Sequence, residues 1–310
     1  MIRFDRVTKL YKTVIGVNDV SLELAPGAYG LLGPNGSVKT TFINLILGQL
    51  RPTLGAVRVF GQDPWRHSEL LRRIGICPAV DILLPAVSGL DWVRYLVRMH
   101  GFGAAEASRR AKEALEIVGM AHAMRRPIGS YSLGMRQRCK VAQSIAHGPE
   151  LLILDEPFNG LDPVGRHELT ELFLKWIADG KSFLLASHLL HEVEAVQPSF
   201  LLISGGRLLA SGSPQEVRSM LADLPNEIHI RVDRPKELAP RLCEVDAVDA
   251  VRIDVHSGEV IVSTRRPLVL SQRLPAIISE GRFKVFELRS GHESLQQLFT
   301  SLMRIHRGEL

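Results

Sequence analysis

Apolar residues along the chain fall into short continuous runs and helical repeats, which alternate over roughly the first two thirds of the sequence. The continuous runs Leu151–Leu154 and Phe183–Ala186 are bounded by polar or helix-breaking residues, which predicts buried strands of a parallel sheet. Between such runs, apolar residues recur every three or four positions, as over residues 166–178, and predict helices. Strands that alternate with helices indicate an α/β domain with a parallel sheet.

Two other patterns interrupt this alternation. In residues 2–24 apolar and polar residues alternate, as at Val20, Leu22 and Leu24, which predicts two or three antiparallel strands. Residues from about 80 to 148 carry three helical repeats, and Ser88 is placed to cap the first of them. The sequence therefore predicts an antiparallel β subdomain and a mostly helical insert within the α/β domain.

The pattern of apolar and polar residues changes after about residue 224. The remaining strands and helices follow the order β-α-β-β-α-β and begin with a strand at Glu227–Val232. A helix at Ser294–Arg304 is expected after the last of these strands. This order predicts a small split βαβ domain of the α+β class, and it shows no catalytic constellation. With 310 residues, the chain is expected to hold two domains, at 1–220 and 225–310.

Between an apolar run that ends at Leu32 and a helical pattern lies a glycine-containing loop. The loop reads Gly33, Pro34, Asn35, Gly36, Ser37, Val38, Lys39, Thr40 and Thr41. Strand, loop and helix in this order are the context of a phosphate-binding loop. Backbone N–H groups and the positive helix end can hold phosphate oxygens, Lys39 supplies positive charge, and the Thr40 hydroxyl is placed to bind Mg²⁺.

Val38 breaks the strict pattern of such a loop, which has glycine at this position. A β-branched residue is costly there if the backbone needs a positive φ, and its side chain limits the approach of a ligand. If φ is negative, the cost is small. The sequence alone leaves both alternatives open, and it leaves a simple strand-to-helix turn as an alternative to a nucleotide site.

A second set of chemical groups follows further along the chain. The run Leu151–Leu154 ends in Asp155 and Glu156, where one carboxylate can bind Mg²⁺ and the next can orient or deprotonate a water molecule. Upstream, Ser132 and Gly134 open a predicted helix and form a second candidate anion site. Two separate anion sites make sense if two subunits face each other.

Composition and charge narrow the classes of protein. The net charge of +5 is modest and mixed with acids, and no basic arm carries interleaved aromatic residues, so we expect no nucleic-acid partner. Three cysteines without metal-ligand spacing are typical of reduced cytosolic thiols. The sequence has no apolar signal core and no run of ~20 apolar residues, which predicts that nothing spans a membrane.

With these motifs in this order, residues 1 to about 220 resemble the ATP-binding subunits of ABC transporters. Six segments carry the resemblance: Tyr11 for the aromatic residue that stacks on adenine, Gly33–Thr41 for Walker A, Tyr131–Met135 for the signature motif, Leu151–Glu156 for Walker B, Asn159–Asp162 for the D-loop and Ser187–His188 for the switch histidine. The resemblance implies a P-loop NTPase fold. The sequence of residues 131–138 and the segment after residue 220 are most similar to those of stand-alone subunits of bacterial exporters.

The resemblance also implies a mechanism. Two such subunits, identical or different, sandwich ATP and Mg²⁺ between the Walker A loop of one and the signature helix of the other. It implies Lys39, Glu156 and His188 as catalytic residues, Thr40 and Asp155 as Mg²⁺ ligands, and Tyr11, Ser132, Gly134 and Asp162 as further nucleotide or interface contacts. Closure and hydrolysis then drive separate membrane-spanning permease subunits, which implies a cytoplasmic protein peripheral to the inner face of the cell membrane. Read from the sequence alone, Tyr11 is otherwise a strand-edge aromatic, His188 a capping or core histidine, and Asp162 also a helix N-cap.

Besides Val38, the sequence departs from this family at Met135, a frequent change among exporters, and at Ala79, where the family has a glutamine that binds Mg²⁺ and contacts the membrane subunit. Asp81 lies near enough in sequence to substitute. These departures motivate a second hypothesis, a regulatory or binding module that hydrolyses ATP poorly. A third, an ABC protein of translation or DNA repair, is disfavoured because such proteins usually carry fused paired domains or long coiled-coil inserts.

Overall fold

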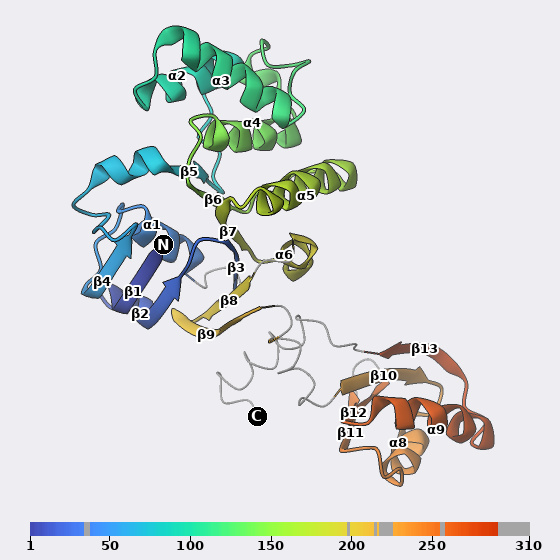
Figure 1. The fold of residues 1–310 in the computed structure, drawn as a ribbon. Helices are drawn as coiled ribbons and strands as arrows, with labels where there is room; N and C mark the ends of the chain where they lie inside the picture. Colours follow the sequence, from blue (N-terminus) through green and yellow to red (C-terminus); the bar gives the residue numbers. More distant parts are fainter. Residues whose placement is uncertain (34–37, 197–198, 214–215, 217–225, 255–257, 291–310) are drawn as a thin grey trace. The chain divides into compact units, whose positions relative to one another are not determined.

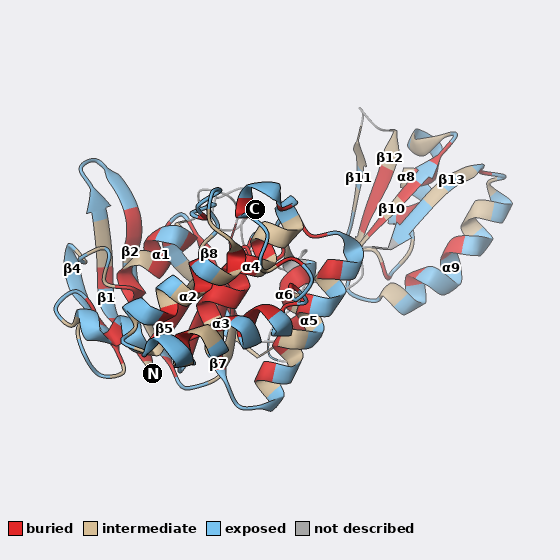
Figure 2. Ribbon diagram, turned by 90° about the horizontal axis from the view of Figure 1, so that it is seen from above, coloured by how far each residue is buried: buried red, intermediate tan, exposed pale blue. Residues whose placement is uncertain are grey.

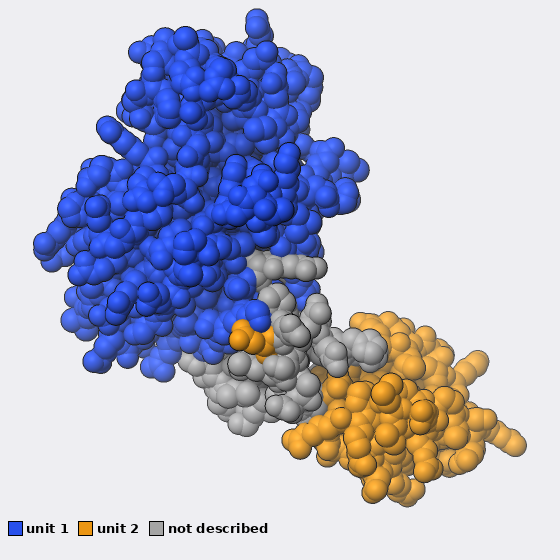
Figure 3. All heavy atoms as spheres, in the orientation of Figure 1, with its two compact units in different colours: residues 1–213 blue, residues 214–310 orange. Residues whose placement is uncertain are grey.

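The computed structural model describes residues 1–33, 38–196, 199–213, 216, 226–254 and 258–290 of the chain. The chain divides into two compact units, Met1–Ser213 and Pro214–Leu310 (Figure 3). The expected domain boundary at residues 220–225 and the helix expected at Ser294–Arg304 lie outside the described residues.

A six-stranded sheet forms the centre of the first unit (Figure 1). In spatial order its strands are β5 (Ile74–Cys77), β6 (Leu151–Asp155), β7 (Ser182–Ser187), β3 (Ala28–Leu32), β8 (Ser199–Ser204) and β9 (Arg207–Gly212). The strands pair in parallel from β5 to β8, and β9 pairs antiparallel with β8. Every residue of β6 and β7 is buried, which explains their almost continuous apolar sequences.

Because β3, β6 and β7 are neighbours and parallel, their carboxyl ends meet at one edge of the sheet. Gly33 follows β3, Glu156 follows β6 and His188 follows β7. Ligands of open α/β sheets bind at this edge, so the topology itself assembles the predicted site.

The predicted antiparallel subdomain is present beside this sheet. It is a three-stranded sheet in the order β2 (Val14–Leu24), β1 (Ile2–Tyr11) and β4 (Leu54–Val59). Helix α1 (Lys39–Ile46) is tied to it by Phe42, whose ring stacks on Phe4 with centroids 4.3 Å apart. Both rings are fully buried, and burial of a phenylalanine contributes about 1.5–3 kcal/mol. This packing fixes the helix that begins at the phosphate loop.

The predicted helical insert is present as well (Figure 1). It follows η1 (Ser68–Arg73) and β5, and consists of α2 (Gly89–Met99), α3 (Ala104–Ile117), η2 (Ile128–Ser130) and α4 (Leu133–Ile145). Ser88 is the N-cap of α2, because its hydroxyl accepts a hydrogen bond from the Asp91 N–H at 3.1 Å. Helix α4 also packs against β5, so the insert is joined to the sheet along this helix.

Two helices differ from the predictions. Helix α5 (Pro163–Ala178) begins three residues before the predicted start at residue 166, because Asp162 caps it and proline is well suited to its first turn. Helix α6 (Leu190–Val196) has no counterpart in the predictions. It spans only seven residues, too few for the apolar repeat to distinguish a helix from a loop.

The second unit has the predicted split βαβ order. Its strands β10 (Asn226–Val232), β11 (Ala250–Asp254), β12 (Glu259–Thr264) and β13 (Val285–Ser290) form an antiparallel sheet in the order β11-β12-β10-β13. Helices α8 (Pro235–Cys243) and α9 (Pro267–Glu280) bury Leu238, Leu242, Leu270 and Leu274 against the strands. The buried residues of this unit form a core of their own (Figure 2).

Candidate ATP site

The phosphate loop connects β3 to α1. Its residues Pro34, Asn35, Gly36 and Ser37 lie outside the described residues, whereas Gly33 and the residues from Val38 onward are placed. Val38 is the N-cap of α1 and has φ 78° and ψ 15°, the left-handed conformation. Its carbonyl accepts the first helical hydrogen bond, from the Phe42 N–H at 3.0 Å. Of the two alternatives that the sequence left open, the structure shows the positive φ.

This conformation is strained for a β-branched residue. A left-handed backbone costs a residue other than glycine roughly 1–2 kcal/mol, and valine has no polar group that could compensate by capping the helix. The side chain is half-buried and packs against the core beneath the loop. The hydrogen bond into α1 and the packing against the core therefore accompany this conformation of Val38.

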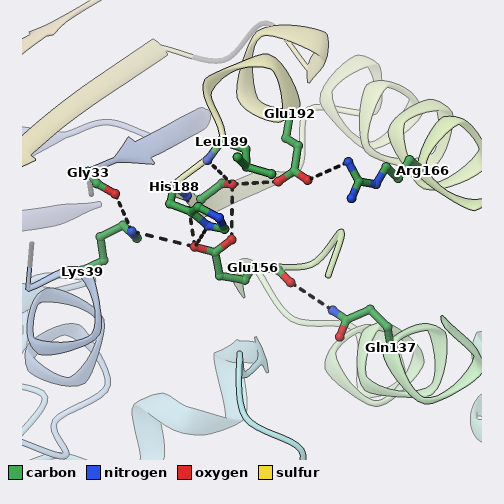
Figure 4. A network of polar contacts seen from close by, with 9 residues as sticks. Gly33, Lys39, Gln137, Glu156, Arg166, His188, Leu189 and Glu192 are labelled. Carbon is green, nitrogen blue, oxygen red and sulfur yellow. Dashed lines mark hydrogen bonds and ion pairs between the residues drawn. The ribbon is translucent and has the colours of Figure 1, made fainter. Parts of the chain in front are cut away.

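Lys39 lies inside the site. Its side chain is buried, and its Nζ donates to the Gly33 carbonyl at 2.6 Å and lies 3.8 Å from Glu156 Oε1 (Figure 4). Burial lowers the pKa of Lys39, an effect opposed by the charges of Glu156 and Asp155. A buried cation that spans the loop and the end of β6 is well placed to meet phosphate oxygens.

Asp155 is the last residue of β6 and is buried. Its pKa is raised to about 6, first by burial and then by the neighbouring Glu156, whereas Lys39 and Lys140 lower it. A carboxylate whose ionised form is disfavoured in this way fits a bound cation, which would supply the missing positive charge.

A hydroxyl and a carboxylate are ligands that Mg²⁺ prefers, so Thr40 and Asp155 fit that ion. Thr40 is exposed at the start of α1, whereas Thr41 is buried. Among the described residues, no group of three histidine, cysteine or acidic side chains could hold a metal. Mg²⁺ is usually bound through one or two protein carboxylates together with substrate phosphates and water.

Glu156 has the most constrained geometry of the site. It follows β6 with φ 50°, and its N–H donates to the Ala186 carbonyl at 2.8 Å. Its Oε1 accepts from the His188 N–H at 3.0 Å and lies 2.9 Å from His188 Nδ1 (Figure 4). The carboxylate is thus aimed by two separate strand ends, and it lies next to Lys39.

A polar chain continues behind Glu156. The Ser187 hydroxyl lies 2.7 Å from Glu192 Oε2 and 3.3 Å from Glu156 Oε2, and its single proton can serve only one of them at a time. Glu192 is buried, and its Oε1 lies 3.5 Å from Arg166 Nη1 without forming a hydrogen bond to any described residue (Figure 4). The sequence analysis missed Glu192 and Arg166, because Glu192 lies on the unpredicted helix α6.

The second candidate anion site is at the start of α4. Ser132 is the N-cap, accepting from the Met135 N–H at 3.2 Å, and both Ser132 and Leu133 are exposed. Gly134 is half-buried close to the D-loop, where an added Cβ would lie 3.3 Å from the Gly160 carbonyl oxygen. The exposed helix start remains available to an anion.

Two further predicted residues have structural partners. Asp162 is the N-cap of α5 and accepts from the Gly165 N–H at 2.8 Å, as the sequence allowed. Tyr11 is about two-fifths exposed, and its hydroxyl lies 3.1 Å from the Thr41 hydroxyl. Tyr11 therefore lies at the edge of the phosphate loop with much of its ring accessible.

The segment after β5 contains no obvious metal ligand. Asp81 is engaged elsewhere, with Oδ2 3.0 Å from Arg136 Nε and Oδ1 accepting from the Leu83 N–H. Asp81 therefore serves as a partner of α4, and nothing in its contacts points to the substitution for the glutamine that the sequence suggested.

Comparisons with known proteins identify the family of the chain. The ABC transporter family model matches residues 17–159. The Nod factor export ATP-binding protein I of Cupriavidus pinatubonensis is 36% identical over 68% of this chain and 66% of its own length. The bacitracin transport ATP-binding protein of Bacillus licheniformis is 30% identical over 98% of this chain and 97% of its own length.

Among solved structures, the ATP-binding subunit of an ABC transporter is similar with a TM-score of 0.65 and 26% identity. The similarity covers 71% of this chain and 93% of that structure. The chain therefore belongs to the ABC transporter family, as one of its ATP-binding proteins, which are ATPases.

Proposed function

We propose that this chain binds and hydrolyses ATP with Mg²⁺ to power an exporter, as one of two ATP-binding subunits that act on separate membrane-spanning subunits. The observation that carries the proposal is the position of the Glu156 carboxylate, which is held by His188 and lies 3.8 Å from Lys39. In this arrangement Lys39 binds phosphate oxygens, and Glu156 orients and deprotonates the attacking water molecule. His188 contacts the terminal phosphate.

The remaining site residues have supporting roles in this proposal. Thr40 and Asp155 hold Mg²⁺, which neutralises charge on the phosphates. Gly33–Thr41 line the phosphates and Tyr11 stacks on the base. Ser132 and Gly134 bind the ATP of the partner subunit, and Asp162 lies at the subunit interface. The exposed start of α4 supports this arrangement, because it offers an anion site that the subunit's own phosphate loop does not use.

Transport and location rest on the relatives. The names of the proteins compared above refer to export of Nod factor and transport of bacitracin. Within the described residues, no helix is both long and apolar enough to cross a membrane, so the proposal assigns transport to other subunits. We place the protein at the inner face of the cell membrane, and we assign residues 225–310 a stabilising or regulatory role in the dimer.

The test is ATP binding and steady-state hydrolysis by the purified chain with Mg²⁺, compared with Lys39→Ala. We expect binding and turnover in the native chain and loss of both in the variant, because the phosphates lose their buried cation. Lys112→Ala is a matched control, because Lys112 is exposed on α3 and pairs with Glu116 on the same helix. Equal turnover in the native and Lys39→Ala proteins would overturn the proposal.

One observation favours the second hypothesis, a module that hydrolyses ATP poorly. Val38 holds a conformation that suits glycine, and its side chain adds bulk to the phosphate loop. ATP binding without turnover, both in the isolated chain and with its membrane subunits, would support that alternative.

A further inference from the structure

Lys140 is a buried cation outside the residues assigned so far. It lies on α4, five residues after the signature motif, and only 4% of its surface is exposed. Its Nζ donates to three successive carbonyls, those of Pro78 at 2.9 Å, Ala79 at 3.2 Å and Val80 at 3.4 Å. An ammonium group has three donors, and here each donor has a backbone acceptor.

Two neighbours on the same helix hold the adjoining residues. Arg136, one turn before Lys140, places Nε 3.0 Å from Asp81 Oδ2, and Gln137 Nε2 lies 3.6 Å from Cys77 Sγ. Lys140 is four residues after Arg136 and three after Gln137, so it shares a helix face with each of them. The segment from Cys77 to Asp81 is therefore attached to α4 at both ends and in its middle.

These contacts join residues 77–81 to α4 in a chain that has alanine where the family has a glutamine. In the family that the sequence resembles, a glutamine in this segment connects it to Mg²⁺, but Ala79 has no group that could do so. Val80 in this segment, and Ile82 and Leu84 just after it, are exposed apolar residues. Under the proposed function, these side chains are available to a membrane subunit.

We propose that Lys140 and Arg136 are positioning residues that make residues 78–81 follow the movement of α4. Binding of nucleotide at the start of α4 then moves residues 78–81 through this helix. The loop needs no metal ligand of its own for this movement. This inference rests on the proposed function for its nucleotide dependence, whereas the attachment itself can be tested without nucleotide.

The first experiment measures amide hydrogen exchange of residues 79–84 in the full chain without nucleotide. Lys140→Met removes the charge and nearly keeps the length of the side chain. The carbonyls of Pro78, Ala79 and Val80 then lose their donor and the segment opens more often, so we expect the Leu83 amide, which donates to Asp81 Oδ1 at 3.1 Å, to exchange about tenfold faster or more. Lys112→Met is the control and should leave this rate unchanged. Arg136→Met removes the charged partner of Asp81 but leaves the acceptor of the Leu83 N–H in place, and a smaller acceleration is expected even if Lys140→Met fails to fold. Native exchange rates in Lys140→Met, or in Arg136→Met if only that variant folds, would overturn the inference.

The second experiment adds ATP and Mg²⁺ in a Glu156→Gln background, which is expected to retain ATP. ATP should slow exchange both at residues 132–137 and at residues 79–84. With Lys140→Met, the first effect should remain and the second should disappear. Adding Ala79→Gln to that variant should restore protection of residues 79–84 only while Mg²⁺ is present, because the metal link is then rebuilt.

The outcomes separate the two proposals. If ATP binds but still protects residues 79–84 in Lys140→Met, the coupling through Lys140 is wrong and the ATP site stands. If the chain binds no ATP at all, the proposed function fails, and only the nucleotide-free attachment is left to be judged by the first experiment.

Discussion

Val38 and Glu156 both belong to the candidate ATP site, and both are residues other than glycine with a positive φ, 78° and 50°. Their surroundings differ. Glu156 is fixed by hydrogen bonds from its own N–H to Ala186 and from the His188 N–H to its carboxylate. Val38 has no side-chain hydrogen bond and only packs against the core.

The difference shows two ways in which a strained backbone persists. At Glu156 the strained backbone orients a carboxylate. One of the hydrogen bonds that offset this strain comes from His188, which also takes part in the proposed reaction. At Val38 the strain lies in the turn into α1 and does not orient a reactive side chain. Strain at Glu156 is therefore expected to be tied to activity, whereas strain at Val38 is expected to be relieved without loss.

The largest effect is expected for Glu156→Gln. The amide keeps the size of the side chain but cannot take a proton from water, so we expect turnover to fall about 10²–10⁴-fold with ATP binding retained. Steady-state hydrolysis and nucleotide affinity measure the two effects. Glu171→Gln, at an exposed position of α5, is the control. Native turnover in Glu156→Gln would show that Glu156 is not the base.

The next effect concerns Asp155, which ends the strand that Glu156 follows. Its folded pKa of about 6 lies above the reference value of 3.8, so the folded state binds a proton more readily than the unfolded state. The nucleotide-free protein should lose stability as pH rises from about 4 to 6, by roughly 3 kcal/mol at 1.36 kcal/mol per pKa unit. Asp155→Asn should remove this contribution. Urea unfolding at pH 4.5 and at pH 7 measures this change in stability. The control is Asp179→Asn at the exposed end of α5. If Asp155→Asn loses as much stability between these pH values as the native protein does, the assignment to Asp155 is wrong.

The outline of this site could be predicted because its chemistry is local in sequence. Lys39 and Thr40 follow a glycine-containing loop, and Asp155 and Glu156 end an apolar run, so residue type and position along the chain were sufficient. The parallel direction of β6, β7 and β3 also follows from the alternation of strands and helices, whereas their order in the sheet comes from the structure.

The remaining features depend on contacts between distant segments. The φ of Val38 is set by the packing of α1, and the partners of Glu192 and Lys140 lie 26 and about 60 residues away along the chain. No spacing in the sequence predicts that Arg166 approaches Glu192 or that Lys140 meets the carbonyls after β5. Such buried polar groups become visible only when the structure shows which donors and acceptors remain to be satisfied.

A moderate effect is expected when Glu192, which shares the Ser187 hydroxyl with Glu156, is replaced. Glu192→Met removes the acceptor that holds the Ser187 hydroxyl at 2.7 Å, so this hydroxyl is free to donate fully to Glu156 Oε2 and make the base less basic. We expect about a tenfold loss of kcat, comparable to one hydrogen bond of about 1.4 kcal/mol, with KM for ATP unchanged.

The control for this prediction is Glu194→Met on the same helix, where the side chain is half-buried. In a Ser187→Ala background, Glu192→Met should cost much less than it does alone, because the two residues then share no hydroxyl. If the two losses simply multiply, Glu192 does not act through Ser187.

The smallest effect, Val38→Gly, tests the comparison most directly. Glycine relieves a left-handed strain of roughly 1–2 kcal/mol, offset in part by the packing that Val38 loses and by the greater freedom of glycine when unfolded. A net gain of about 1 kcal/mol should raise Tm by about 2–4 °C, and ATP affinity should rise because the loop can approach the phosphates more closely. Glu156→Gly is the matched substitution: it relieves strain of the same kind, yet it should abolish turnover. If Val38→Gly lowers Tm, packing outweighs strain at this position; if it changes neither ATP affinity nor turnover, Val38 does not impair the site, and the two strained residues differ only in what their side chains do.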